Sequence, residues 1–289
     1  MSILECTHDM NVSKSNIIRH TSLISFLTAL LMLGIAYPFL RGDYDRLALP
    51  ISTMIQVFGL VGLSLVPVGI LWLTMPKYQF GFAITSIIIS TFIILLIALF
   101  ATLSVGKSFG LLVILLWTFI VALLLPKTKR LKGQLSIKFH FQPLYLIYLP
   151  SITLLLQLTL AKPLTQLSRN HAIENANGFI RDIEEYRKQR GTYPLTLQAQ
   201  NKDYYPDVVG VEKYLYAPHR NGFNLSFEQP RFLLDRFGTR EWVVYNPLDE
   251  NSVYSHTTWL LPTEQDEATQ GWYASGETEH RHWKYFLFD

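Results

Sequence analysis

The segment Pro126–Gln142 reads PKTKRLKGQLSIKFHFQ and separates two long apolar stretches. It contains five basic residues and no acidic residue. Cytoplasmic loops of membrane proteins are enriched in Lys and Arg in this way. The segment therefore predicts a multi-pass membrane protein with this loop in the cytoplasm. Once this loop is placed, the side of every other segment follows.

Five segments lack charged residues and are long enough to cross about 30 Å of hydrocarbon as helices. They are Thr21–Leu40, Ile51–Met75, Phe80–Val105, Ser108–Leu125 and Leu144–Ala161. We therefore expect a cytoplasmic N-terminal segment at residues 1–20 and an all-α transmembrane domain of five helices at residues 21–161. Residues 162–289 are expected to form a small α+β domain.

Orientation follows from the basic loop. If Pro126–Gln142 is inside, the fifth span runs outward, the N-terminus is cytoplasmic and residues 162–289 lie outside. Lys14 and Arg19 agree with this topology, whereas Lys107 opposes it. The prediction is a multi-pass membrane protein with an extracytoplasmic C-terminal domain.

Charge divides unevenly between the two parts. Residues 1–161 carry 11 basic and 4 acidic residues, whereas residues 162–289 carry 14 basic and 18 acidic residues. A mildly acidic outer domain does not have the concentrated basic face that nucleic acid requires, so we expect no nucleic-acid partner. The single cysteine, Cys6, excludes an intramolecular disulfide.

The predicted spans contain no Asp, Glu, Lys, Arg or His. Ion-coupled transporters and proton relays place ionisable groups inside the membrane, and their absence disfavours those classes. Gln56 and Gln157 are the strongly polar residues, and we interpret them as hydrogen-bonding between helices.

Small residues form a stripe along the second span, which indicates close packing against another helix. The alternative is a pore or a dimer contact. The stripe consists of Ser52, Gly59, Gly62 and Gly69. Pro67 and Pro150 lie inside spans and predict kinks or freed carbonyls.

A further helix is expected from about Ser168, which would be its N-cap. Its apolar positions step by three and four and predict one buried stripe: Ile173, Ala176, Ile180 and Ile183. Gly191 predicts a left-handed stop. Pro163 predicts a break between this helix and the fifth span.

Strand-like runs follow the helix. Asn221-Gly222 predicts a hairpin turn between Lys213–Ala217 and Phe223–Glu228. Further strands are expected at 240–245, 253–261 and 281–288, with a polar surface loop at 263–270. One long helix on a small antiparallel sheet buries both apolar faces.

The run Tyr186-Arg-Lys-Gln-Arg-Gly191-Thr-Tyr193-Pro194 resembles a segment of bacterial pseudopilins and related pilin-like domains. Those proteins share Tyr, four residues, Gly, any residue, then Tyr-Pro. The resemblance covers roughly residues 168–228 and implies a helix on an antiparallel sheet with an interaction role. Four additional spans precede the helix, so it does not imply a polymerising subunit, and it carries over no catalytic residue.

Residues that could carry chemistry are few. His280 and His282 would share one face of a strand, where Glu277 or Glu279 could complete a metal site. An exposed strand with mixed polar residues explains the same pattern. His219 and His256 have no nucleophile near them in sequence. We therefore predict no catalytic, cofactor-binding or metal-binding residue, and no cofactor.

Three functions are compatible with this sequence. The leading hypothesis is a non-catalytic interaction or scaffolding protein whose residues 162–289 meet an envelope protein. The second is a permease component or lipid-handling protein with a cavity lined by Gln56, Gln157 and the Ser and Thr residues of 85–91. The third is an envelope enzyme, which requires its histidines and carboxylates to converge.

Aromatic side chains are abundant in the predicted outer domain, where they would form either its core or a contact surface. They are Tyr214, Tyr216, Trp242, Tyr245, Trp259, Trp272, Tyr273, Trp283 and Tyr285.

Overall fold

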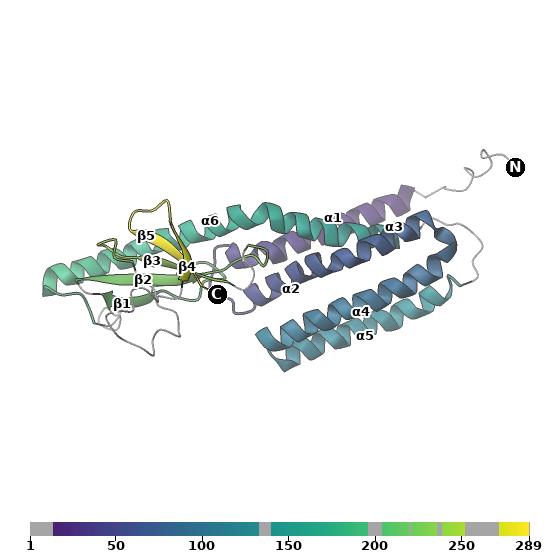
Figure 1. The fold of residues 1–289 in the computed structure, drawn as a ribbon, viewed down its shortest axis with the longest axis horizontal. Coiled ribbons are helices and arrows are strands. Elements are labelled where there is room, and N and C mark those ends of the chain that lie inside the picture. The colour runs from purple at the N-terminus through teal and green to yellow at the C-terminus, as the bar shows by residue number, and fades with distance from the viewer. Residues whose placement is uncertain are drawn as a thin grey trace. The chain divides into compact units, whose positions relative to one another are not determined.

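The computed structural model describes residues 14–132, 140–195, 204–219, 221–235, 239–251 and 272–288 (Figure 1). The α-helices are α1 (Lys14–Ala36), α2 (Ala48–Val61), α3 (Val66–Thr74), α4 (Gln79–Ser104), α5 (Lys107–Lys129) and α6 (Gln142–Arg190). Short 3-10 helices are η2 (Tyr37–Phe39), η3 (Gly62–Leu65) and η4 (Pro76–Tyr78). The strands are β1 (Leu215–His219), β2 (Gly222–Gln229), β3 (Arg240–Tyr245), β4 (Trp272–Glu277) and β5 (Trp283–Phe288).

Five helical segments of the described chain are long and apolar enough to cross a membrane. They are Lys14–Phe39, Ala48–Thr74, Pro76–Ser104, Lys107–Lys129 and Gln142–Arg190. The helical part of the predicted fold is thereby confirmed. Residues 133–139 of the basic loop lie outside the described residues, and Lys127 and Lys129 occupy the last turn of α5.

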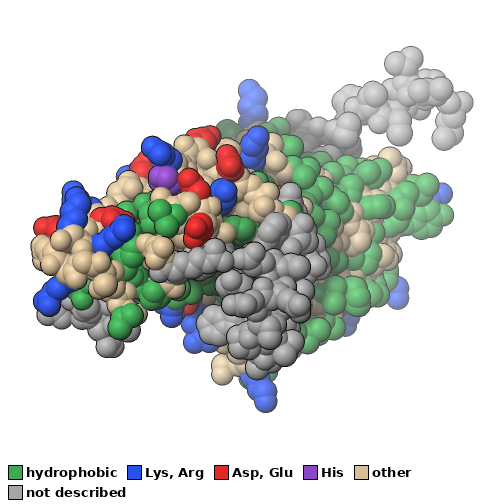
Figure 2. Space-filling model, turned by 60° about the vertical axis from the view of Figure 1, so that its left-hand side comes forward, with side chains coloured by type: hydrophobic (Ala, Val, Ile, Leu, Met, Phe, Trp, Pro, Cys, Tyr) green, Lys and Arg blue, Asp and Glu red, His purple; other side chains and the backbone are tan. Residues whose placement is uncertain are grey.

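The chain divides into two compact units. The helical unit comprises Met1–Ile35 and Pro50–Leu158, and the sheet unit comprises Ala36–Leu49 and Thr159–Asp289. Hydrophobic side chains dominate the surface of the helical unit, whereas charged side chains gather on the sheet unit (Figure 2). Leu115, Leu116 and Phe119 of α5 are each more than half exposed, as expected of a helix that meets lipid.

The small-residue stripe packs against α6, which confirms its interpretation as an internal helix contact. A Cβ atom on Gly59 would lie 2.6 Å from Thr153 Cγ2 and 2.7 Å from Gln157 Nε2. A Cβ atom on Gly69 would lie 2.7 Å from Ile147 Cγ1. Only glycine allows the helix backbones to approach this closely.

Gln157 connects α6 to α2, as predicted, and the Gln56 amide bonds to a residue of its own helix. Gln157 Nε2 donates to the backbone oxygen of Gln56 at 2.9 Å, and Gln56 Nε2 donates to Ser52 Oγ at 3.0 Å. Ser52 Oγ in turn donates to the Ile35 carbonyl at 2.9 Å. Both glutamines are buried.

Pro67 perturbs the second span as predicted. Proline cannot donate to the carbonyl four residues earlier, which here belongs to Leu63. The chain tightens into η3 immediately before Pro67, and α3 begins with proline in its first turn. Pro150 instead lies inside the uninterrupted helix α6.

The expected break at Pro163 is wrong. Helix α6 runs without interruption from Gln142 to Arg190. Burial of Gln157 before Pro163 and of Thr165 after it stabilises helical backbone on both sides, which outweighs the loss of one hydrogen bond. Ser168 is consequently not an N-cap, and its hydroxyl donates to the Thr165 carbonyl.

The sheet unit consists of the C-terminal part of α6 lying on a five-stranded antiparallel sheet of order β1-β2-β3-β5-β4 (Figure 1). Ala172, Ile173, Ala176, Phe179 and Ile183 of α6 are buried in one core. The sheet contributes Phe223, Leu225, Phe227, Val243 and Trp283 to that core. The predicted stripe is confirmed, with Ile180 partly buried.

Several aromatic residues of the sheet unit belong to cores rather than to a free surface. Tyr214 and Trp283 are buried, and Tyr216, Tyr245 and Tyr285 pack against them. Trp242 packs against Val244, Phe286 and Phe288 in a separate cluster. Trp259 lies outside the described residues, as do the side chains of Trp272 and Tyr273.

The predicted hairpin and the strand at 240–245 are confirmed. Pairing in the hairpin extends to His219 and Gly222, so the turn is tighter than expected. The strand expected at 281–288 begins only at Trp283, and the strand and loop expected at 253–261 and 263–270 lie outside the described residues. Strand β4 was not predicted. Helix α6 ends as expected, because Gly191 adopts a φ of 78°.

The segment between the first two spans belongs to the sheet unit. Val209 N donates to the Leu40 carbonyl at 3.0 Å, and Gly42 N donates to the Asp207 carbonyl at 3.2 Å, which forms an antiparallel bridge between Arg41 and Val208. The buried ring of Phe39 stacks on that of Phe232 with centroids 4.7 Å apart. We refer to Ala36–Leu49 as the docked loop.

Candidate functional site

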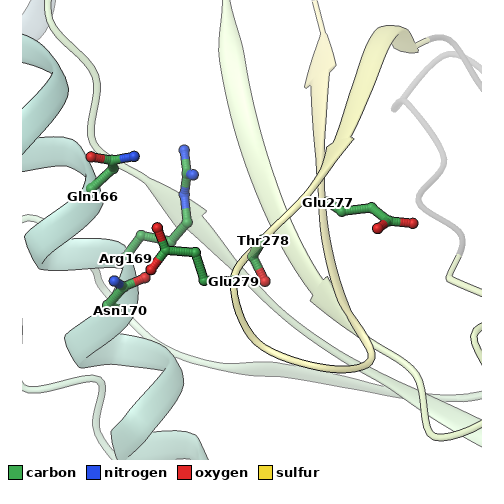
Figure 3. Close-up of a pocket in the computed structure, with 6 residues that line it drawn as sticks. All are labelled: Gln166, Arg169, Asn170, Glu277, Thr278 and Glu279. Atoms are coloured by element: carbon green, nitrogen blue, oxygen red, sulfur yellow. The ribbon is translucent and has the colours of Figure 1, made fainter.

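A polar hollow of about 240 Å³ opens between α6 and the turn that joins β4 to β5 (Figure 3). We call it the polar pocket. Its lining residues are Gln166, Arg169, Asn170, Glu277, Thr278 and Glu279. The three residues from α6 are spaced by three and four positions and therefore share one helix face.

The side chains of the pocket differ in whether they already make hydrogen bonds within the protein. Thr278 Oγ1 already donates within the turn, to the carbonyls of His280 and Trp283. Among the described residues, neither Gln166, Glu277 nor Glu279 has a side-chain hydrogen bond or ion pair. Figure 3 shows Glu279 directed toward α6 and Glu277 pointing away from it.

Arg169 connects the pocket to a buried ionic cluster. Its guanidinium forms an ion pair with Glu241 and lies 4.8 Å from the centroid of the Tyr285 ring. Arg231 approaches the other oxygen of Glu241 at 3.6 Å and Asp235 at 3.4 Å. The Nε–H group of Arg169 is buried and makes no hydrogen bond within the described residues.

Burial dominates the electrostatics of Glu241, whose side chain is 3% exposed. Loss of solvation raises the pKa of the Glu241 carboxyl above its ordinary value, although Arg169 and Arg231 both favour the charged form. A buried carboxylate between two arginines holds both guanidinium groups in place. Removing it would leave two cations without their common partner.

This arrangement can bind a small polar ligand. A guanidinium, two primary amides and a free carboxylate provide donors and acceptors on opposite walls. The pocket lining contains neither a histidine nor a free nucleophile. The geometry fits a small polar group that carries both charges or several hydrogen-bonding atoms.

The histidines do not form the arrangement considered for a metal site. His280 and His282 lie in the turn before β5 and not on one face of a strand, so that expectation is wrong. His282 adopts a φ of 67°, and its Nδ1 lies 2.9 Å from Asp249 Oδ1. Within the described residues, no group of three His, Cys, Asp or Glu could hold a metal ion.

His219 and His256 are the other histidines considered in the sequence. His219 ends β1, its side chain lies outside the described set, and His256 lies outside the described residues altogether. His171, which no sequence pattern indicated, contacts Asp207 Oδ2 through Nε2 at 2.9 Å. Asn175 Nδ2 donates to the Pro206 carbonyl at 2.9 Å beside it. These contacts fix Pro206 and Asp207 in place. The Asp207 carbonyl accepts the hydrogen bond from Gly42 N of the docked loop.

The polar pocket and its ionic cluster could not be found from the sequence. Arg169 and Asn170 resemble an ordinary solvated helix face, and Glu241 lies in an alternating strand beside an exposed arginine. Only the pairing of β3 with β2 and β5 places Glu241 inward. Comparison with family models, curated proteins and solved structures found no match.

Proposed function

We propose that this chain is a non-catalytic interaction protein of the bacterial cell envelope. Its apolar helices anchor it in the inner membrane with the N-terminus in the cytoplasm, and its sheet unit faces outward to bind an envelope protein. The observation that carries this proposal is the continuity of α6 from an apolar span into the core of the sheet unit.

The continuity of α6 supports this proposal because a helix has less conformational freedom than a flexible linker. A linker of ten residues behaves as a coil, whereas a helix has a fixed rise of about 1.5 Å per residue. The helix that packs on the sheet is therefore continuous in sequence with the fifth span. The arrangement supports the pilin-like interpretation of this domain, in which a long helix carries an antiparallel sheet.

The docked loop supports the proposed topology. It connects the first two spans, and the fifth span leads into the C-terminal domain. With five spans, this loop and the C-terminal domain lie on the same side of the membrane. Their backbone hydrogen bonds support a topology in which both lie on one side.

The alternative of a permease or lipid-handling bundle receives less support. It requires Gln56 and Gln157 to face a cavity. The Gln157 amide instead donates to the Gln56 carbonyl of α2, and the Gln56 amide donates to Ser52 of its own helix. Ser86 and Thr91 donate to carbonyls of their own helix. Contacts of this kind stabilise packing between helices and leave few polar groups for a pathway.

Site-specific photo-crosslinking in native membranes tests the proposal with the full chain. A photoreactive residue would replace Leu195 or Tyr205, which are 84% and 68% exposed in the sheet unit. The matched control position is Leu158, which is 64% exposed on the apolar part of α6. We expect one defined protein adduct at the first two positions and lipid adducts at Leu158. Lipid adducts alone at all three positions would refute a protein partner and direct attention to transport and lipid assays.

A further inference from the structure

We infer that the polar pocket binds the headgroup of a phospholipid that carries a primary ammonium beside its phosphate, as phosphatidylethanolamine does. This inference goes beyond the proposed protein partner and uses different residues. It depends on three observations: the position of the pocket along α6, the free polar groups in it, and the balance of their charges.

The pocket residues of α6 follow its apolar run closely in sequence. Gln166, Arg169 and Asn170 follow Ala161, the last residue of the apolar run, by five to nine positions. At 1.5 Å per residue this corresponds to about 8–14 Å along the helix axis. The headgroup layer on each side of the hydrocarbon is about 5–8 Å thick. Gln166, about 8 Å along the axis, comes to the edge of that layer, and Arg169 and Asn170 begin about 12–14 Å along the axis, so the inference requires the headgroup to extend to them.

An exposed leucine supports this depth. Leu167 is 57% exposed and lies between Gln166 and Ser168 on α6. Leu164, one turn earlier, is partly exposed. Apolar side chains beside a polar pocket are expected where a helix leaves the hydrocarbon, and Lys162 can extend its ammonium toward the same interface.

The charges match a zwitterion. Arg169 and the amides of Gln166 and Asn170 line the pocket and can donate to phosphate oxygens. Glu279 is directed toward them from the opposite wall and can accept hydrogen bonds from an ammonium group (Figure 3). The Glu241 carboxylate already neutralises part of the guanidinium charge, so a ligand with phosphate alone would gain less.

The same geometry disfavours the other common headgroups. A choline group presents three methyl groups and no N–H, so it cannot donate to Glu279. A glycerol or other anionic headgroup places uncompensated negative charge near Glu277 and Glu279. The expected preference is ethanolamine over choline and over glycerol.

The test uses the full chain purified in detergent, with native mass spectrometry as the readout. Short-chain phosphatidylethanolamine, phosphatidylcholine and phosphatidylglycerol are titrated separately, and soluble phosphoethanolamine is the fourth ligand. We expect phosphatidylethanolamine to bind at least about tenfold more tightly than the other lipids, since only its ammonium group can donate a charge-assisted hydrogen bond to Glu279.

Variants assign the binding to the pocket. Glu279→Gln should weaken phosphatidylethanolamine binding about tenfold, and Glu279→Lys should reverse the preference toward phosphatidylglycerol. Glu212→Gln is the matched control, because Glu212 is a similarly exposed carboxylate that pairs with Lys213 elsewhere in the sheet unit. It should leave all affinities unchanged.

Two results would overturn the inference. Equal binding of the three lipids, or equal losses in Glu279→Gln and Glu212→Gln, would show that the pocket does not select a headgroup. Soluble phosphoethanolamine binding as tightly as the lipid would show that the pocket recognises a free metabolite-sized zwitterion and not a membrane lipid. Neither result would affect crosslinking at Leu195 and Tyr205.

Discussion

Two glycine-to-alanine substitutions in the sheet unit should change its stability in opposite directions. Gly210 lies under the docked loop, and a Cβ atom there would be 2.6 Å from the Pro38 carbonyl oxygen and 3.1 Å from Pro230 Cβ. Gly178 lies on α6, where an added Cβ atom would meet nothing within 4 Å. The same chemical change therefore introduces a backbone clash at one site and only removes backbone freedom at the other.

The expected magnitudes follow from these distances. Alanine at Gly210 must displace Pro38, which forces overpacking worth about 1–3 kcal/mol. It also stretches the 2.8 Å hydrogen bond from Gly210 N to Pro38 O, worth about 0.5–1.5 kcal/mol. We expect destabilisation of about 3 kcal/mol and a Tm lower by about 6–12 °C. Alanine at Gly178 should stabilise by about 0.5–1 kcal/mol and raise Tm by about 1–4 °C.

Thermal unfolding of the full chain in detergent measures both changes, and amide hydrogen exchange locates them. In Gly210→Ala, protection should be lost at Gly42, Asp45 and Val209, whose N–H groups bond across the docked loop. Gly178→Ala should leave that protection intact. An unchanged Tm in Gly210→Ala, or Tm shifts of the same sign in both variants, would refute the packing described for the docked loop.

Three further predictions concern other parts of the fold. Gly59→Leu should disrupt packing of α2 on α6 and lower the Tm of the full chain by at least about 5 °C, whereas Gly81→Ala, with nothing within 4 Å, should have little effect. Phe39→Ala should destabilise the sheet unit by about 3–5 kcal/mol, because it removes a buried ring stacked on another; a loss below 1 kcal/mol in chemical denaturation would contradict that burial. Burial raises the pKa of Glu241, so the folded state binds the Glu241 proton more tightly than the unfolded state does. The stability of the wild type should therefore rise relative to that of Glu241→Gln as the pH falls from 7 toward the ordinary carboxyl range. Parallel curves of stability against pH for the two proteins would argue against this prediction.

Much of the helical unit could be predicted because lipid imposes a simple pattern. Runs of apolar residues predict the five spans, and the stripe of small residues predicts the face of α2 that packs on α6. The α6 stripe and the hairpin at Asn221-Gly222 follow from local periodicity and turn chemistry. Each of these features depends on neighbours in sequence.

The features that were missed depend on distant contacts. Pro163 favours a break locally, but α6 is packed before and after it and stays helical. The docked loop pairs residues 38–45 with residues 207–210, and no periodicity encodes a bridge between segments so far apart. The inward position of Glu241 likewise results from strand pairing. Local propensity cannot supply information that arises only from tertiary packing.

The docked loop and the C-terminal domain form one folded unit, and we propose that this unit lies outside the cytoplasm. Arg41 and Val208 form a pair without direct hydrogen bonds in an antiparallel bridge, where Cα atoms are about 4.5 Å apart and a disulfide fits. In intact cells that express Arg41→Cys/Val208→Cys on a Cys6→Ser background, the account predicts a spontaneous disulfide. It would protect both thiols from maleimide until reduction, whereas Arg41→Cys/Ser275→Cys stays fully reactive. Free thiols in both double variants would contradict the contact, the outward location or both.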